Sequence, residues 1–318
     1  MTDPAPPVQV FLFEFVCGGG CIEFSSFGAP AGSLYAEGAE MLRAVADELT
    51  SLPNIQVTCP VDSRVASHLN LPQVKTVPVD NLQSLHKSFD HGKETSDYFV
   101  AIAPEINHAL EAYTKRFEHP QKLLTPGPEV VALCSDKWAT FQFLTQHKIL
   151  TPASRLGNTD QLFTGLNVCK PRWGAGSWGV SVVENWQEVI EHAASNGLGF
   201  GDLMIQEYVP GLPSSIGLFR SENSTTYFPA VEQVFRENTL EYTGCGTALD
   251  FSMQNRATEL LNQVVTALPP FTGYLGIDMV MGNCSDEDYV IEINPRFTTS
   301  FCTTRKLVPE NCFEFITR

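Results

Sequence analysis

The 318-residue chain is 43% hydrophobic, enough to bury a sizeable core, and its length suggests two or three domains. Its 20 Lys and Arg residues stand against 36 Asp and Glu residues, and this net charge of −16 disfavours binding to nucleic acid or to an anionic membrane. No apolar run reaches the roughly 20 residues of a membrane span, and no secretory signal is visible, so we expect a cytoplasmic protein. The nine cysteines lack paired spacing, so we expect their thiols to be reduced.

The first part of the chain alternates between expected strands and helices. Residues 8–16 (VQVFLFEFV) are mostly apolar, which is typical of a buried strand, and three glycines at 18–20 end it. Ser33 is a candidate N-cap of the next helix. Further strands are expected at 55–59 and 98–103. A strand, a glycine loop, a helix and a strand in this order predict a parallel α/β domain over residues 1–120.

Short strands and glycine turns characterise the rest of the chain, residues 121–318. After a linker with two prolines, Asp136 is expected to begin a helix that Pro152 ends. The later elements are expected to be strands at 167–171, 180–183 and 204–211, a helix at 185–195, and strands at 274–281 and 289–296. A short acidic connection between the last two strands indicates an antiparallel hairpin.

A glycine-rich segment, RWGAGSWGV, occupies residues 172–180. Gly174, Gly176 and Gly179 have dinucleotide-motif spacing, but a strand instead of a helix is expected after them, which favours a hairpin. Such a hairpin, including Ala175 and Ser177, can fold over a triphosphate and offer backbone N–H groups to it. The alternative is an ordinary flexible hairpin.

Acidic and amide side chains occur on the two C-terminal strands. Glu292 and Asn294 are two residues apart, so they project from one face, with the flanking isoleucines on the other. Asp278 lies in an equally apolar strand. Two carboxylates and an amide oxygen brought together would suit Mg²⁺. A buried acid pair neutralised by Arg296 or Arg305 is an equal alternative on spacing alone.

The strand QEYVPG begins at Gln206 and is expected to contact adenine through its backbone. Glu207 and Val209 would face the base, with Tyr208 between them. The alternative interpretation is another core strand.

Taken together, these elements and their order resemble the ATP-grasp superfamily over residues 125–305. The matching residues, in chain order, are Lys137, Lys170, the glycine loop, QEYVPG, Asp278, and Glu292 with Asn294. The resemblance implies an α/β plus α+β protein. In it, a Rossmann-like pre-ATP-grasp domain precedes an ATP-grasp domain that has a nucleotide lid subdomain at about 150–208.

The same resemblance implies site residues. ATP would contact Lys137, Lys170, Gly174, Ala175, Gly176, Ser177, Gly179, Gln206, Glu207, Tyr208 and Val209. Mg²⁺, or Mn²⁺ in its place, would bind Asp278, Glu292 and Asn294. The chain lacks the acid that many relatives use for ribose, and it has Gly276 where many have an arginine. Arg296 is therefore the first candidate to stabilise the transition state and Arg172 the second, although Arg296 could instead form a structural salt bridge to Glu292.

Several amino-terminal segments, FEFVCGGG among them, resemble tyramine–L-glutamate ligases. Those enzymes and their bacterial relatives belong to methanofuran-type cofactor synthesis in one-carbon metabolism. The likeness implies an acceptor site walled by the backbone of Gly18, Gly19 and Gly20, with Glu14 and Glu105 nearby to suit a cationic amine. The alternative is a tight strand-to-helix connection at the glycines.

The function expected from the sequence is therefore an ATP-dependent carboxylate–amine ligase that forms an acyl phosphate. L-glutamate and tyramine are the candidate small-molecule substrates, and a homodimer is the assembly to test. Two alternatives stay open: another ATP-grasp ligase branch, of the peptide or purine-pathway type, and a nucleotide-binding module without catalysis. The complete set of expected magnesium ligands argues against the second.

Overall fold

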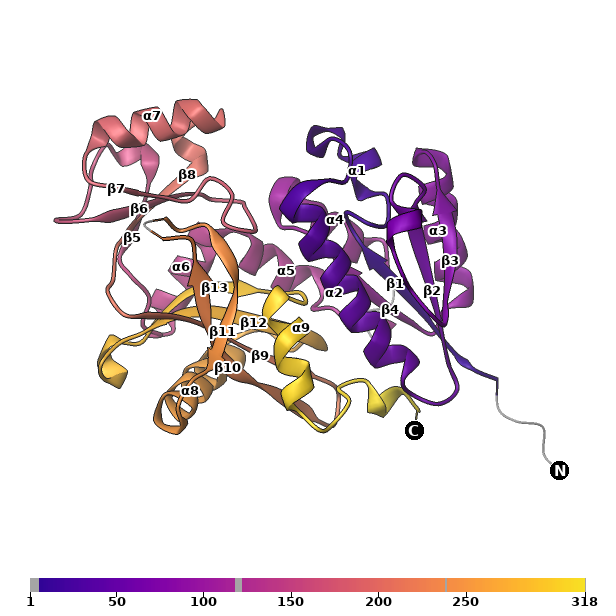
Figure 1. The fold of residues 1–318 in the computed structure, drawn as a ribbon. Helices are drawn as coiled ribbons and strands as arrows, with labels where there is room; N and C mark the ends of the chain where they lie inside the picture. The colour runs from indigo at the N-terminus through magenta and orange to yellow at the C-terminus, as the bar shows by residue number, and fades with distance from the viewer. Residues whose placement is uncertain (1–5, 118–121, 238, 318) are drawn as a thin grey trace.

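The computed structural model describes residues 6–117, 122–237 and 239–317. Three β-sheets organise them: one with α2 against it, one covered by α7, and one that carries α8 (Figure 1). The domain boundary expected near residue 120 falls at 118–121, outside the described residues.

The first sheet is parallel and has the strand order β3-β2-β1-β4. Its strands are β1 (Val8–Glu14), β2 (Ile55–Asp62), β3 (Val74–Val79) and β4 (Tyr98–Ile102). Its helices are α1 (Gly20–Glu23), α2 (Gly32–Thr50), α3 (Leu82–Thr95) and α4 (Ala109–Lys115). Leu12 packs into the core shared with α2, whereas Phe11 and Phe13 contact Phe89 of α3 on the other face. Both faces of the sheet are covered, so residues 10–13 of β1 are all apolar and buried, and the expected parallel α/β arrangement is confirmed.

The second sheet is antiparallel, in the order β5-β8-β6-β7. Its strands are β5 (Ser154–Leu156), β6 (Asn167–Pro171), β7 (Ser181–Val183) and β8 (Leu203–Glu207). Helix α7 (Trp186–Asn196) covers one face, and the Asn185 side chain caps it by accepting a hydrogen bond from the Glu188 N–H. Cys169 and Ile205 belong to a hydrophobic core that this sheet has to itself.

Five antiparallel strands form the third sheet, in the order β11-β10-β9-β12-β13. The strands are β9 (Leu212–Arg220), β10 (Thr225–Phe235), β11 (Tyr242–Ala248), β12 (Gly273–Met281) and β13 (Tyr289–Asn294). The remaining helices are α5 (Pro128–Ser135), α6 (Lys137–Gln146), α8 (Phe251–Ala267) and α9 (Thr299–Thr304). Leu261 and Val264 of α8 pack on one face, whereas Phe219 and Tyr274 share a core with Leu12 of β1. The expected β12–β13 hairpin is confirmed.

Element ends differ from the sequence expectations at several places. Strand β1 stops at Glu14, because the chain then turns and the Gly18 N–H bonds to the Glu14 carbonyl. Ala31 occupies the N-cap of α2, so Ser33 lies inside the helix and does not cap it. Asp136 caps α6 as expected, but that helix ends at Gln146, well before Pro152.

Candidate active site

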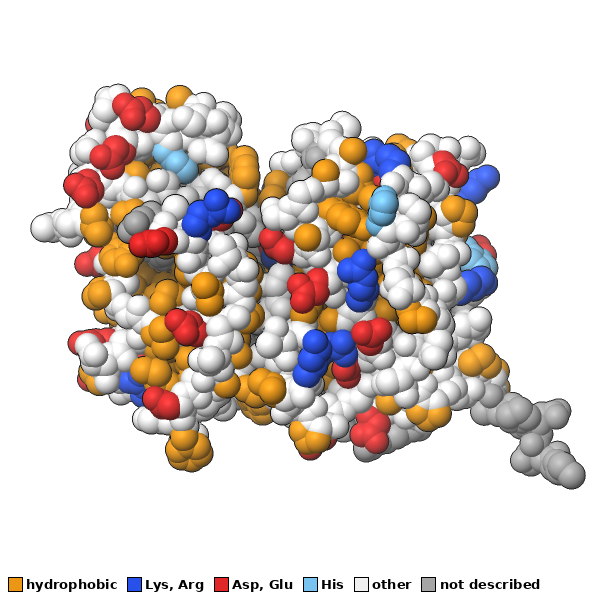
Figure 2. Space-filling model, viewed as in Figure 1, with side chains coloured by type: hydrophobic (Ala, Val, Ile, Leu, Met, Phe, Trp, Pro, Cys, Tyr) orange, Lys and Arg blue, Asp and Glu red, His pale blue; other side chains and the backbone are white. Residues whose placement is uncertain are grey.

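A pocket of about 250 Å³ lies between the second and third sheets, and α2 of the first part closes one side. The molecular surface is indented between the block that carries α7 and the block that carries α1 and α2 (Figure 2). Of the residues proposed from the sequence, its lining includes Lys137, Lys170, Gly174, Ala175, Gly176, Ser177, Gln206, Glu207, Tyr208, Val209, Asp278, Glu292, Asn294 and Arg296. Residues separated by more than 150 positions are therefore brought to one cavity.

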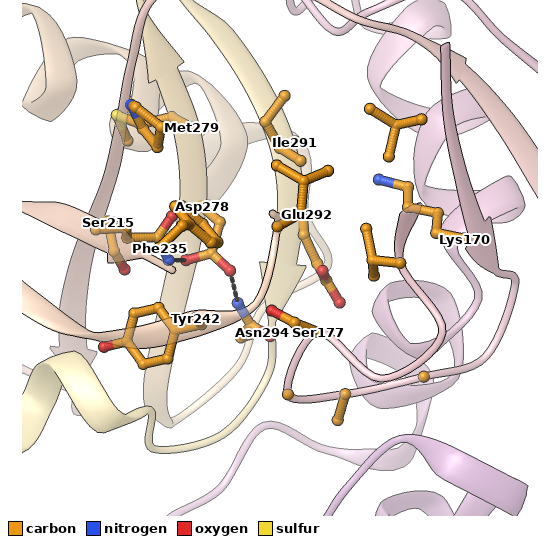
Figure 3. A pocket seen from close by; sticks show the side chains of 18 of the residues that line it. Lys170, Ser177, Ser215, Phe235, Tyr242, Asp278, Met279, Ile291, Glu292 and Asn294 are labelled. Atoms are coloured by element: carbon orange, nitrogen blue, oxygen red, sulfur yellow. Dashed lines mark hydrogen bonds between the residues drawn. The ribbon is translucent and has the colours of Figure 1, made fainter. Parts of the chain in front are cut away.

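Two carboxylates lie side by side on the third sheet (Figure 3). Asp278 of β12 pairs in register with Glu292 of β13. Asp278 accepts hydrogen bonds from Gln233 Nε2 at 2.9 Å and from Asn294 Nδ2 at 3.0 Å. Burial, and then the neighbouring Glu292, raise the pKa of Asp278 to about 6. The hydrogen bond from Asn294 and the positive charge of Arg296 offset only part of this rise in pKa.

A bulge in β13 shapes this wall of the pocket. Asp278 pairs with Glu292 but Met279 pairs with Val290, which leaves Ile291 as an extra residue. Ile291 and Glu292 both line the pocket in consequence, although we expected Ile291 on the opposite face. That expectation was wrong because strict alternation of side chains holds only where the pairing is regular.

Two buried lysines face the carboxylates from the other side of the pocket. Lys137, the first residue of α6, donates to Glu292 Oε1 at 2.6 Å and to the Gly174 carbonyl at 2.8 Å. Lys170 of β6 donates to Gln206 Oε1 at 2.8 Å. Burial lowers the pKa of Lys170 to about 8, and nearby Lys137 acts in the same direction, whereas Glu292 opposes both. Both lysines lie where an anion in the pocket would reach them.

Arg296 lines the pocket, but its ion pair is with Glu105 and not with Glu292. Its Nε and Nη2 donate to the two carboxylate oxygens of Glu105 at 2.9 and 3.0 Å. Arg305 pairs with Asp47 and Glu48 of α2 instead. The interpretation that Arg296 or Arg305 forms the salt bridge to the acids was therefore wrong, because Lys137 reaches Glu292 directly.

Arg172, the second catalytic candidate, is engaged outside the pocket lining. Its guanidinium bonds to both carboxylate oxygens of Asp136 at 2.7 and 2.6 Å and lies over the ring of Trp173. Because Asp136 also caps α6, Arg172 supports the helix end that presents Lys137. The position of Arg172 gives no support to a catalytic role.

The glycine-rich loop joins two antiparallel strands, β6 and β7, so the expected hairpin is confirmed. Gly176, Ser177 and Gly179 have positive φ angles of 64°, 58° and 65°, a backbone conformation that glycine adopts most readily. The bond from Lys137 to the Gly174 carbonyl fastens the loop over the pocket. Gly179 lies outside the lining because it packs against Pro171.

The strand expected to contact adenine ends earlier than its motif suggests. Strand β8 stops at Glu207, and Tyr208 continues as an irregular segment along the pocket. Gln206 is buried, with its Oε1 held by Lys170 and its Nε2 donating to Ser154 Oγ at 3.1 Å. This side chain therefore fixes the position of Lys170 in the pocket.

The residues expected to wall the acceptor site lie elsewhere. Glu14 is 2% exposed and accepts a hydrogen bond from the Cys17 N–H at 2.7 Å. A Cβ atom on Gly18 would lie 2.5 Å from the Glu14 carbonyl oxygen, so the turn needs glycine there for packing. Glu105 is engaged by Arg296. The arrangement favours the alternative that we considered, a tight strand-to-helix connection, and none of these residues lines the pocket.

Several lining residues were missed in the sequence. Glu37 and Met41 of α2 are one helical turn apart and reach the pocket from the first part of the chain. Gln233 of β10 and Tyr242 of β11 line it from the third sheet, whose strands at 212–248 had no sequence prediction. The i, i+4 spacing of the α2 pair is visible in the sequence, but the sequence does not reveal what that face meets.

The oxygen ligands in the pocket fit a hard divalent cation that takes only a few of its ligands from the protein. Asp278, Glu292 and Asn294 offer carboxylate and amide oxygens, the ligand type that Mg²⁺ takes together with phosphates and water. Within the described residues, no three His, Cys, Asp or Glu side chains gather into a metal-binding cluster. A metal ion held here would therefore depend on phosphate oxygens as well.

Comparison with known families agrees with this architecture. A family model described as an ATP-grasp domain matches residues 134–300, and one described as a pre ATP-grasp domain matches residues 55–131. The chain belongs to the ATP-grasp family, because the ATP-grasp domain model matches more than half of it. The family expected from the sequence is thereby confirmed.

Individual relatives are distant. The tyramine–L-glutamate ligase of Methanocaldococcus fervens is 25% identical over 215 residues, which are 65% of this chain and 61% of that protein. The chain thus covers less than two thirds of this relative's length. A solved structure from Archaeoglobus fulgidus assigned to the ATP-grasp superfamily has a TM-score of 0.69 at 24% identity, covering 94% of this chain and 84% of that one. The L-amino acid ligase from Bacillus licheniformis has a TM-score of 0.68 at 16% identity, with 99% and 74% covered. The two solved structures establish likeness of fold.

None of the described helices combines the length and the apolar character needed to traverse a bilayer.

Proposed function

We propose that the chain is an ATP-dependent ligase that joins a carboxylate to an amine through an acyl phosphate. The observation that carries this proposal is the placement of Lys137 and Lys170 opposite Asp278 and Glu292 in one pocket. Buried lysines and half-buried acids in one pocket suit a magnesium triphosphate, because the lysines would neutralise phosphate charge and the acids would neutralise the metal ion.

In the first step, an oxygen of the substrate carboxylate attacks the γ-phosphorus of ATP. The bond from that phosphorus to the β–γ bridging oxygen breaks, and ADP leaves. Lys137 and Lys170 hold the phosphates in line, and the 174–179 loop covers them with its backbone N–H groups. Mg²⁺ bound by Asp278, Glu292 and Asn294, or Mn²⁺ in its place, would neutralise phosphate charge.

In the second step, the amine nitrogen attacks the carbonyl carbon of the acyl phosphate. The carbon–oxygen bond to phosphate breaks, inorganic phosphate leaves, the nitrogen releases a proton to solvent and an amide forms. Arg296, held by Glu105 and lining the pocket, is placed to stabilise negative charge on the departing phosphate. Gln206, Glu207, Tyr208 and Val209 would line the adenine end.

L-glutamate and tyramine are the substrates that we propose to test first, because curated relatives are named for that pair. The product would then serve methanofuran-type cofactor synthesis. A cytoplasmic location, a domain boundary near residue 120 and a homodimer are the accompanying proposals.

The test is ADP release with ATP, Mg²⁺, L-glutamate and tyramine, each omitted in turn, with mass spectrometry of the product. We expect ADP release only in the complete mixture and a product with the mass of the amide. Turnover with another acid or amine, and none with this pair, would overturn the substrate proposal alone. ADP release that needs neither an acid nor an amine would overturn the ligase proposal.

A further inference from the structure

Glu37 is a half-buried carboxylate in the pocket that none of the steps above uses. It reaches the lining from α2, together with Met41 one helical turn later. Its Oε2 lies 3.8 Å from the position that a Cβ atom of Gly176 would occupy, so the carboxylate faces the glycine-rich loop. An acid from the first part of the chain is thus placed against the loop that we expect to cover phosphate.

A carboxylate in this position needs a cation. Burial raises the pKa of Glu37, the positive charge of Arg296 opposes that rise, and nearby Glu40 adds to it. The hydrogen bonds and ion pairs of the described residues include none to Glu37, and the guanidinium of Arg296 is bound to Glu105. With a polyphosphate beside the loop, an unpartnered Glu37 would repel it.

The missing cation is not the metal ion of the Asp278 and Glu292 pair. The absence of any three-member acidic cluster among the described residues shows that Glu37 does not join those two acids in one metal site. A separate positive charge between Glu37 and the loop would compensate this carboxylate. In a ligation reaction, the second substrate supplies one, because a primary amine reaches the enzyme as an ammonium ion.

We propose that Glu37 anchors the ammonium group of the amine substrate and so selects cationic primary amines as acceptors. The inference rests on the proposed function and adds a residue and a substrate class to it. The anchor holds the nitrogen on the side of the loop where the acyl phosphate would form, and the ammonium group releases a proton to solvent before the neutral amine attacks. Glu37 is then a specificity-determining residue supplied by the first part of the chain.

The test compares two nucleophiles on wild type and Glu37→Gln. Hydroxylamine is largely uncharged near neutral pH and captures acyl phosphates as hydroxamates, so it needs no carboxylate anchor. With ATP, Mg²⁺ and L-glutamate, we expect the variant to form hydroxamate at the wild-type rate. Its kcat/KM for tyramine should fall about 10- to 100-fold, as for a lost charged hydrogen bond. The KM for ATP should not change.

Two control variants and a wider set of amines sharpen the result. Glu40→Gln removes an exposed acid of the same helix outside the pocket lining and should leave both reactions unchanged. Glu37→Asp keeps the charge and should lose less tyramine activity than Glu37→Gln. If tyramine is a poor substrate for wild type, the most active of a set of primary aliphatic amines replaces it.

The outcomes separate the two proposals. Wild-type tyramine kinetics in Glu37→Gln, or an equal loss of hydroxamate and amide formation, would overturn the anchor while the ligase proposal stands. The anchor would also be overturned if wild type forms hydroxamate from hydroxylamine but forms an amide with none of the primary amines tested. No hydroxamate from wild type with any carboxylic acid tried would overturn the acyl-phosphate mechanism, and the anchor with it.

Discussion

Replacing Lys170 by methionine should strengthen the fold at neutral pH while it weakens nucleotide binding. Lys170 is 3% exposed, and burial lowers its pKa from the ordinary 10.5 to about 8. Holding this side chain charged in the folded protein therefore costs about 3 kcal/mol. Methionine has a similar shape and no charge, but it leaves Gln206 Oε1 without its donor, at a cost of about 1–3 kcal/mol. We expect Lys170→Met to raise the free energy of unfolding by about 0–2 kcal/mol at pH 7.

The pH dependence gives the sign of the effect. Below pH 8, Lys170 is protonated in both folded and unfolded chains, and its full cost is present. Between pH 8 and 10.5, the folded state has lost a proton that the unfolded state retains, so wild-type stability rises with pH. The variant lacks this rise, and near pH 10.5 the lost hydrogen bond should make it the less stable protein.

The assay is urea unfolding at pH 7, 9 and 10.5, followed by the fluorescence of the four tryptophans. Lys75→Met, at an exposed position on β3, is the control and should give a constant difference from wild type. Titration calorimetry should show at least tenfold weaker Mg-ATP binding by Lys170→Met. A stability difference between Lys170→Met and wild type that does not change with pH would refute the reasoning.

Three further predictions concern the acids around the pocket. Glu292→Gln removes a proposed magnesium ligand, so ADP release should fall by about 100-fold or more with an unchanged circular dichroism spectrum; a wild-type rate would contradict the metal assignment. Glu105→Gln leaves the buried charge of Arg296 without its acidic partner and should lower the free energy of unfolding by about 3 kcal/mol. Adding Arg296→Met to that variant should recover part of the lost stability. An unchanged melting temperature in Glu105→Gln would argue against the ion pair. Asp136→Ala removes the N-cap of α6 and the partner of Arg172 and should cost about 1–2 kcal/mol in urea unfolding, more than Arg172→Gln; the opposite order would discount the cap.

Features that depend on neighbours in sequence were predictable. The pairing of Asp278 with Glu292 follows from two apolar strands joined by a short acidic connection, and the cap at Asp136 follows from residue type and position. The hairpin at the glycine loop was predictable because a strand pattern follows it directly. In each case, the determining contact lies within about 20 residues along the chain.

Contacts between distant parts of the chain were not predictable. Arg296 pairs with Glu105 across 191 residues, and no local pattern relates the two. Glu37 reaches the glycine loop only because α2 packs against α9, an arrangement set by contacts between distant parts of the chain. The side on which Ile291 projects depends on the bulge, and the bulge depends on how β12 pairs with β13. A prediction that assumes strict alternation of side chains along a strand cannot include this irregular pairing.

The distribution of the cores has a consequence for motion. Leu12 of the first sheet and Phe219 of the third lie in one continuous hydrophobic core, so those two sheets should move as a single body and unfold together. The second sheet packs around Cys169 and Ile205 in a core of its own. We therefore expect entry to the pocket to be opened by swinging the second sheet away, which requires breaking the bond between Lys137 and the Gly174 carbonyl but does not expose either large core. Substrate exchange would then break only a few polar contacts, and the two large hydrophobic cores would stay packed throughout each catalytic cycle.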